Sequence, residues 1–245
     1  RLYHCWKTNG HGKMNVTDAI KQSCDVFFYE ISKKLGIDKI AEVAKDFGLG
    51  QSYDISMPNQ KTGIVPNKKW KKEKIGESWY AGETLISAIG QGFVLTNPFQ
   101  LAVMTSIIAS NGKIVEPTII KDNPVSFKTN EKYSNEIKII KKAMFQVVNE
   151  NKGTAFKSRL EDIKFAGKTG TSQVRRISLS ERESYDFREK EQEWKNRDHA
   201  LFVGYMPYDD PKYSISVIIE HGGSGASTAA PIAKQVFNYI NELEV

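Results

Sequence analysis

Apolar residues recur at helical spacing through the N-terminal part of the chain. After the capping sequence NVTD at 15–18, this spacing predicts a helix that ends at Gly36. The short polar side chains of the SCD sequence at 23–25 compete for backbone hydrogen bonds, so we expect the helix to break there. A second helix is predicted over about residues 37 to 47, because Gly48 can end it.

The middle of the chain alternates between irregular and helical patterns. Residues 50 to 82 are rich in Pro, Asn, Lys and Gly and predict a long irregular loop. The segment 82–112 predicts two helices, the second capped by Asn97 with Pro98 in its first position. A strand over residues 113 to 120 is expected to follow the Asn-Gly turn that ends this helix.

Residues 134 to 150 predict an amphipathic helix, because apolar residues fall on one stripe. That stripe is formed by Ile137, Ile140, Met144 and Val148. A short helix near 153 to 160 is expected next, before a strand over 163 to 174 that carries the sequence AGKTGTSQV.

The C-terminal part predicts strands joined by loops. The charged stretch 175–198 predicts a solvated loop, and strands are expected over 199 to 206 and 213 to 220. A final helix is predicted over about residues 227 to 242. Since the strands follow one another without crossover helices, we expect an antiparallel sheet flanked by helices, an α+β fold.

The composition is that of a globular protein: the chain has 245 residues, 40% of them hydrophobic and 26% charged. No apolar run of about 18 residues is present, so no membrane span is expected. The sequence starts at Arg1 without an initiator methionine or an apolar leader, which is typical of a piece of a longer protein.

The net charge of +6 comes mainly from lysine, which is concentrated in KKWKKEK at 68–74. Such a cluster can bind nucleic acid, a membrane surface or an acidic polymer, or it can be a solvated loop. The solvated loop is the simpler interpretation. Since no nucleic-acid motif accompanies the cluster, we expect no nucleic-acid partner.

The strand sequence AGKTGTSQV at 166–174 places a lysine and several hydroxyl or amide side chains in an otherwise strand-like segment. It is either a sheet edge whose polar side chains face water or one wall of a site for an anionic substrate. The tripeptide Lys-Thr-Gly alone is weak evidence, since a second copy occurs at 61–63 in the long predicted loop.

Five sequence blocks in order carry a resemblance to a known family: GKMNVTDAIKQSCDVFFYEIS, IGQGFVLTNPFQLAV, AGKTGTSQV, HALFVGYMP and GGSGASTAAPIAKQVF. With these blocks the chain resembles the transpeptidase domain of class B penicillin-binding proteins, especially the elongation-specific subfamily. The resemblance covers almost the whole chain. It implies the fold shared by penicillin-binding proteins and β-lactamases.

The family has three active-site motifs, Ser-x-x-Lys, Ser-x-Asn/Asp and Lys-Ser/Thr-Gly. Ser23, with Cys24 and Asp25, matches the second, and Lys168-Thr169-Gly170 matches the third. No Ser-x-x-Lys precedes Ser23. We therefore expect residues 1–245 to be a partial transpeptidase domain whose N-terminal part, with the nucleophile, lies outside this chain. The formal match at Ser110-Asn111-Gly112-Lys113 is in the wrong order, at a helix end.

The resemblance implies a role for each matched residue. Ser23 and Lys168 would be catalytic, with Ser23 moving a proton and Lys168 supplying positive charge. Asp25, the third catalytic residue, would order the site. Thr169, Gly170 and Thr171 would bind the D-Ala-D-Ala end of a peptidoglycan stem peptide, or a β-lactam antibiotic in its place, with Thr171 also giving an oxyanion donor.

Two cysteines, Cys5 and Cys24, leave three alternatives: free thiols, a disulfide, or a metal site that includes His11. The zinc site is favoured, because some elongation-type transpeptidases that this chain resembles carry a structural zinc beside the Ser-x-Asp motif. The spacing of Cys5, His11 and Cys24 is similar to theirs. A structural zinc usually has four ligands, so a fourth is expected before Arg1. No cofactor is expected for catalysis.

The resemblance implies a D,D-transpeptidase that cross-links peptidoglycan during cell elongation. It further implies a periplasmic domain of an inner-membrane protein, with elongation-complex membrane proteins as partners. Two other functions stay open: a β-lactamase or β-lactam sensor of the same superfamily, or a non-catalytic module that binds the cell wall.

Overall fold

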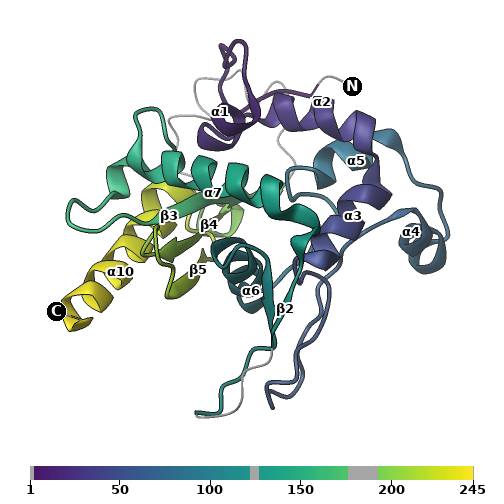
Figure 1. The fold of residues 1–245 in the computed structure, drawn as a ribbon. Coiled ribbons are helices and arrows are strands. Elements are labelled where there is room, and N and C mark those ends of the chain that lie inside the picture. The colour runs from purple at the N-terminus through teal and green to yellow at the C-terminus, as the bar shows by residue number, and fades with distance from the viewer. Residues whose placement is uncertain (1–2, 122–126, 176–192, 245) are drawn as a thin grey trace.

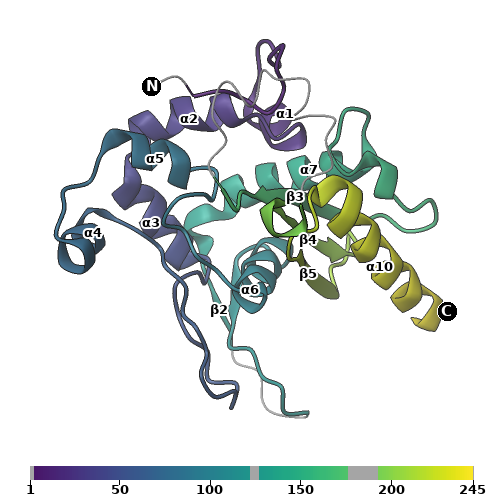
Figure 2. The same ribbon diagram turned by 180° about the vertical axis from the view of Figure 1, so that it is seen from behind.

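The computed structural model describes residues 3–121, 127–175 and 193–244. Figures 1 and 2 show opposite sides of the ribbon. The helices are α1 (Val16–Lys21), α2 (Asp25–Leu35), α3 (Ile37–Asp46), α4 (Lys68–Ile75), α5 (Ala81–Ser87), α6 (Pro98–Ala109), α7 (Ser134–Asn149) and α10 (Ala230–Glu244). The strands are β1 (Lys113–Val115), β2 (Phe127–Thr129), β3 (Ala166–Ser172), β4 (His199–Met206) and β5 (Tyr213–Ile219). Single turns are η1 (Glu131–Tyr133), η2 (Phe156–Ser158), η3 (Trp194–Asn196) and the π-helical η4 (Gly225–Ala229).

The central sheet has the order β3-β4-β5, and both pairs are antiparallel. In the first pair Lys168 lies opposite Val203 and Gly170 opposite Leu201. Among the described strands, β3 therefore lies at one edge of this sheet, with its outer side turned away from β4. The predicted antiparallel arrangement of these strands is confirmed.

Helices cover both faces of this sheet. Alternate residues of a strand point to opposite faces, so one strand contributes side chains to two buried clusters. On one side Phe202 of β4 belongs to the same buried cluster as Phe237 of α10. On the other side Tyr205 of β4 packs in a cluster with Ile108 of α6 and Met144 of α7. The expected C-terminal helix therefore packs on the sheet, as the yellow helix in Figure 1 shows.

The predicted long helix is broken where the sequence indicated. α1 ends at Lys21, α2 begins at Asp25, and Gly36 separates α2 from α3. In Figure 1, α1 and α2 lie above the central sheet. This arrangement positions the candidate site.

The prediction of an irregular loop over residues 50 to 82 was wrong in part, because α4 lies within it. The Asn67 side chain accepts a hydrogen bond from the Trp70 N–H, and Gly76 ends the helix in a left-handed conformation. Lys71 is buried and paired with Glu83 at 2.5 Å. The many lysines concealed the helical pattern, since one of them points inward.

Two other elements are shorter than predicted. The strand expected over 113 to 120 is only β1, which pairs with β2, a strand that the sequence did not predict. The helix expected near 153 to 160 is the single turn η2. Of the predicted charged loop 175–198, residues 176–192 lie outside the described residues. In the described part of the chain, no helix is both long and apolar enough to cross a lipid bilayer.

Candidate active site

The break between α1 and α2 presents Ser23 in a strained conformation. The Ser23 φ angle is 51°, in the left-handed region that non-glycine residues rarely adopt. The Cys24 N–H closes the turn by donating to the Ala19 carbonyl at 2.9 Å. Such strain is concentrated at functional sites, because surrounding contacts must hold it in place.

Trp6 supplies one of those contacts, although sequence reasoning did not single it out. Its indole N–H donates to the carbonyl oxygens of Ser23 at 2.8 Å and Gln22 at 3.2 Å. The Trp6 backbone N–H donates to the Asp25 carboxylate at 3.0 Å. The segment before α1 is thus tied to the turn that carries Ser23.

Lys168 of β3 reaches this turn and donates a hydrogen bond to the Ser23 hydroxyl. It also donates to the Thr169 carbonyl at 2.8 Å. The two residues to which the resemblance gives catalytic roles are thus in direct contact. Two motifs that are 145 positions apart in sequence therefore form one site.

Burial shifts the pKa values of the two ionisable side chains in the site, Lys168 and Asp25. Burial lowers the pKa of Lys168 to about 8, and the negative charge of Asp25 opposes this shift. Burial raises the pKa of Asp25, while the hydrogen bond from Trp6 and the charge of Lys168 act in the other direction. A lysine whose pKa lies near neutral pH, and which is hydrogen-bonded to a hydroxyl, can accept and return a proton.

The outer part of β3 holds the three other predicted residues. Thr171 is exposed, and its hydroxyl accepts a hydrogen bond from the Gly225 N–H at 3.4 Å. The Thr169 hydroxyl is bonded to that of Thr154 at 2.7 Å. Both threonines lie on the same face of the strand, because they are two positions apart.

Gly170 is required by close packing within the protein. A Cβ at Gly170 would lie 3.2 Å from the Leu201 Cβ. Gly225 packs still more closely, since its Cβ would lie 2.2 Å from the Gly170 carbonyl oxygen. The resemblance placed Gly170 among the residues that bind the substrate, but the sequence did not indicate the close contact between Gly225 and β3.

Gln91 also reaches β3 and was missed by sequence reasoning. Its carboxamide bonds to the Thr171 carbonyl and to the Gln173 N–H. Gly90 and Gly92 flank it with positive φ angles, so the loop between α5 and α6 turns sharply there. The IGQG sequence was visible, but no local pattern indicated a partner 80 positions away.

Cys5, His11 and Cys24 come together beside the turn, with their ligand atoms all within 4.8 Å of one another. The Cys5 sulfur lies 3.5 Å from His11 Nδ1, and both cysteines are free thiols rather than a disulfide. A tetrahedral Zn²⁺ with usual bond lengths separates a sulfur from a nitrogen ligand by about 3.5 Å. The three residues therefore fit a zinc ion.

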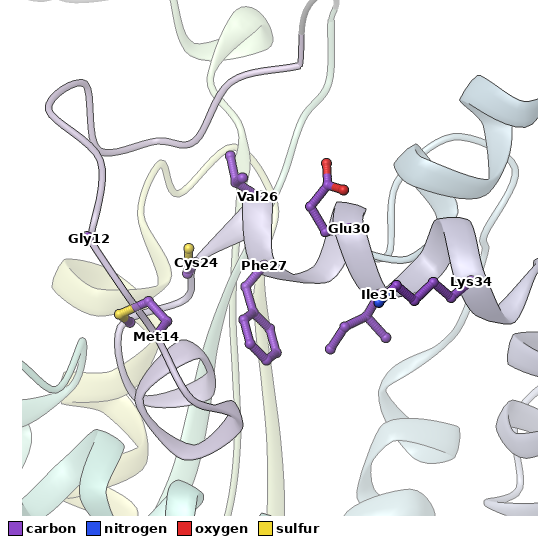
Figure 3. A pocket seen from close by; sticks show the side chains of 8 residues that line it. All are labelled: Gly12, Met14, Cys24, Val26, Phe27, Glu30, Ile31 and Lys34. Atoms are coloured by element: carbon purple, nitrogen blue, oxygen red, sulfur yellow. The ribbon is translucent and has the colours of Figure 1, made fainter.

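A cavity of about 250 Å³ lies along α2 next to this cluster. Figure 3 shows its lining, which includes Cys24, Phe27 and Ile31. None of Ser23, Asp25 and Lys168 belongs to that lining. The cavity is thus separate from the groups that could carry chemistry, and it does not mark the active site.

The two other matches to the family motifs, at residues 61–63 and 110–113, lie in different surroundings. The Lys61-Thr62-Gly63 copy is in the loop before α4, where the Thr62 carbonyl accepts from Gln100 at 2.9 Å. Ser110 is the C-terminal cap of α6, and its hydroxyl donates to the Ser106 carbonyl at 2.8 Å. The Lys113 ammonium lies over the ring of Phe127. Among the described contacts, neither match pairs a serine hydroxyl with a lysine ammonium.

Comparisons with known proteins show which family this chain is similar to. The family model described as "Penicillin binding protein transpeptidase domain" matches residues 1–238. The chain is 34% identical to peptidoglycan D,D-transpeptidase MrdA of Haemophilus influenzae, over 98% of this chain and 38% of that protein. It is 35% identical to the MrdA of Acinetobacter baumannii, over 96% of this chain and 35% of that protein.

A solved structure extends the likeness to the fold. The complex between PBP2 and MreC from Helicobacter pylori superposes with a TM-score of 0.86 at 33% identity, covering 98% of this chain and 42% of the matched one. The chain thus spans less than half the length of the relatives that it matches.

Proposed function

Because the chain belongs to the penicillin-binding protein transpeptidase family, we propose that it is the transpeptidase part of a peptidoglycan D,D-transpeptidase of the elongation type. The hydrogen bond from Lys168 to Ser23 carries this proposal, since it joins two family motifs into one site. The substrate is the D-Ala-D-Ala end of a stem peptide, and β-lactam antibiotics take its place.

The reaction is acyl transfer in two steps. A serine outside this chain attacks the carbonyl between the two D-alanines, and the terminal D-alanine leaves as an amine. The amine of a second stem peptide then attacks the acyl-enzyme, releases the serine and completes the cross-link.

The residues of this chain move protons and hold charge. Ser23, bonded to Lys168, passes a proton to the leaving amine and later accepts one from the incoming amine. Asp25 keeps the site ordered through its bond to the Trp6 N–H and supports the positive charge of Lys168. Lys168 holds the Ser23 hydroxyl through its hydrogen bond, and its positive charge attracts the substrate carboxylate.

The edge of β3 binds the peptide. Thr169 and Thr171 offer hydroxyls to the terminal carboxylate from one face of the strand. The Thr171 N–H is one donor to the oxyanion that forms on the attacked carbonyl, and a donor of this kind contributes about 3 kcal/mol to catalysis. Gly170 keeps the strand close to its neighbours and leaves the edge flat.

Cys5, His11 and Cys24 hold a structural zinc in this proposal. When bound, zinc would cross-link the segment before α1 to the start of α2 and would take no part in the reaction. Since Cys24 follows Ser23 directly, the metal fixes the position of the Ser23 turn. The fourth ligand comes from a segment that is not in this chain.

The whole protein is proposed to act in the periplasm, held to the inner membrane by a segment outside this chain. The PBP2 of Helicobacter pylori has been solved in complex with MreC. By analogy, elongation-complex membrane proteins are the proposed partners of this one.

Labelling with a fluorescent penicillin tests the function in a longer form of the protein that includes the preceding segment. We expect stable covalent labelling that Ser23→Ala slows by about 10²- to 10⁴-fold, as for loss of acid–base catalysis. Ser52→Ala, an exposed serine in the long loop, is the matched control. Labelling of Ser23→Ala at the unaltered rate would contradict the proposal, and rapid hydrolytic release of the label would indicate a β-lactamase.

A further inference from the structure

The Gln91 carboxamide lies against the outer edge of β3. Its Nε2 donates to the Thr171 carbonyl at 2.9 Å, and its Oε1 accepts from the Gln173 N–H at 3.2 Å. One side chain thus satisfies two backbone groups of the same strand edge. A peptide unit of a neighbouring strand would make the same pair of hydrogen bonds.

The register of the sheet shows which backbone groups are outward. In an antiparallel ladder, a residue points its N–H and its C=O to the same side. Because the Thr171 carbonyl and the Gln173 N–H bind Gln91, these residues face away from β4. The Thr171 N–H therefore faces outward as well, next to the carbonyl that Gln91 holds.

An extended ligand that pairs with this edge needs both outward groups of Thr171. Opposed residues of a hydrogen-bonded antiparallel pair exchange two bonds. If the attacked carbonyl accepts from the Thr171 N–H, the N–H of that same ligand residue donates to the Thr171 carbonyl. In the free protein, Gln91 occupies that acceptor position.

We propose that Gln91 competes with the substrate for the β3 edge: its carboxamide holds the place of the substrate's backbone N–H on the Thr171 carbonyl until the substrate displaces it. This inference rests on the proposed function. A ligand with the N–H replaces the bond that Gln91 gives up, whereas a ligand without it does not. Gln91 therefore weakens the binding of an acylated D-alanyl residue, whereas an ester, which has no hydrogen to offer the Thr171 carbonyl, leaves the Gln91 carboxamide in place.

The position of Gln91 suits such an exchange. It lies at the surface between Gly90 and Gly92, whose φ angles are 75° and 73°. Its carboxamide makes hydrogen bonds only to the β3 edge among the contacts of the described residues. Moving it aside therefore breaks these two bonds and leaves the buried core undisturbed.

Two ligands that differ in one N–H test the inference on the longer form of the protein that includes the preceding segment. N-acetyl-D-alanyl-D-alanine carries the N–H, and O-acetyl-D-lactyl-D-alanine has an ester oxygen there. Titration followed by ¹⁵N NMR reports the Thr171 amide and the Gln91 carboxamide. We expect the dipeptide to shift both signals, and the ester to leave the Gln91 signal in place.

Variants then measure the competition. Gln91→Ala should tighten binding of the dipeptide by about three- to tenfold, the value of one hydrogen bond, and leave binding of the ester unchanged. Gln91→Met, which keeps the length of the side chain but cannot hydrogen-bond, should behave like Gln91→Ala. Gln235→Ala, on the exposed side of α10, is the matched control and should behave like the unaltered chain.

The outcomes separate this inference from the proposed function. If the dipeptide shifts the Thr171 amide but Gln91→Ala changes both affinities equally, or Gln91→Met restores the unaltered values, Gln91 has only a structural role and the inference is overturned. If neither ligand shifts the Thr171 amide of the unaltered chain, the proposed function fails, and this inference fails with it.

Discussion

Lys168 on the edge strand donates a hydrogen bond to Ser23, which lies 145 positions earlier at a helix break. The two residues come from distant parts of the sequence and from different kinds of element. Their contact depends on the packing of α1 and α7 beneath the break and on the register of β3. The site is thus a product of the whole fold rather than of one motif.

The pKa of Lys168 can be measured by NMR titration of its side chain. We expect a pKa of about 8, because burial disfavours the charged ammonium. Asp25→Asn should lower it further, since the Asp25 charge raises it. Asp38→Asn, in the exposed pair of Asp38 with Lys68, should leave it unchanged. A Lys168 pKa that rises in Asp25→Asn would contradict the electrostatic description.

The same shift predicts a pH dependence of stability. The folded state gives up the Lys168 proton near pH 8, while an unfolded lysine keeps it to about pH 10.4. Over that window the unfolded state binds more protons, so the stability of the protein relative to Lys168→Met should rise with pH. Urea denaturation of both proteins from pH 7 to 10 measures this difference. A constant difference over that range would show that Lys168 keeps an ordinary pKa.

The 245-residue chain alone should form no covalent adduct with penicillin. Ser110 is bonded to the Ser106 carbonyl at a helix end, and the ammonium of Lys113 lies over Phe127 instead of near the hydroxyl. Intact-mass spectrometry after incubation with benzylpenicillin provides the measurement. Ser110→Ala is the control that would identify the nucleophile if a mass increase were found.

The longer protein should contain about one zinc ion per chain, bound through Cys5, His11 and Cys24. Cys24→Ala and His11→Ala should each lower the metal content measured by elemental analysis, while His4→Ala, next to Cys5, should retain it. A content far below one zinc in the unaltered protein, or a Cys5–Cys24 disulfide, would rule the site out.

Trp6→Phe should loosen the Ser23 turn, because it keeps an aromatic ring but removes the indole N–H that binds the Ser23 carbonyl. We expect a local loss of about 0.5–1.5 kcal/mol. Hydrogen exchange of the Cys24 amide measures it directly. Trp194→Phe, at another exposed tryptophan, should leave that exchange rate unchanged.

Phe202→Ala should lower the free energy of unfolding by about 3–5 kcal/mol, since Phe202 is fully buried beneath α10. Phe127→Ala, at a side chain that is 59% exposed, is the matched control and should change it by less than about 0.5 kcal/mol. Denaturant unfolding of the two variants compares them. Equal losses would show that the core is not organised around β4.

Local signals in the sequence predicted the elements that local physics determines. The break at Ser23 follows from short polar side chains, and the strands around Lys168 follow from their pattern of apolar residues. The pairing of these two residues could be expected only from the resemblance to a family, because no local rule links distant segments.

Other features were hidden from sequence reasoning for physical reasons. Lys71 looks like part of a solvated lysine run, yet it is buried because Glu83 compensates its charge. Gln91 resembles any loop glutamine until β3 is placed beside it. Gly225 shows its importance only through the closeness of Gly170.

The open side of β3 also affects how copies of this protein behave toward one another. Unpaired strand edges are sites where two molecules can join into a continuous sheet and aggregate. Here Lys168 holds the Thr169 carbonyl, and Gln91 holds the Thr171 carbonyl and the Gln173 N–H. The edge is therefore shielded by side chains that a small peptide can move aside, while a second strand would have to displace all of them at once.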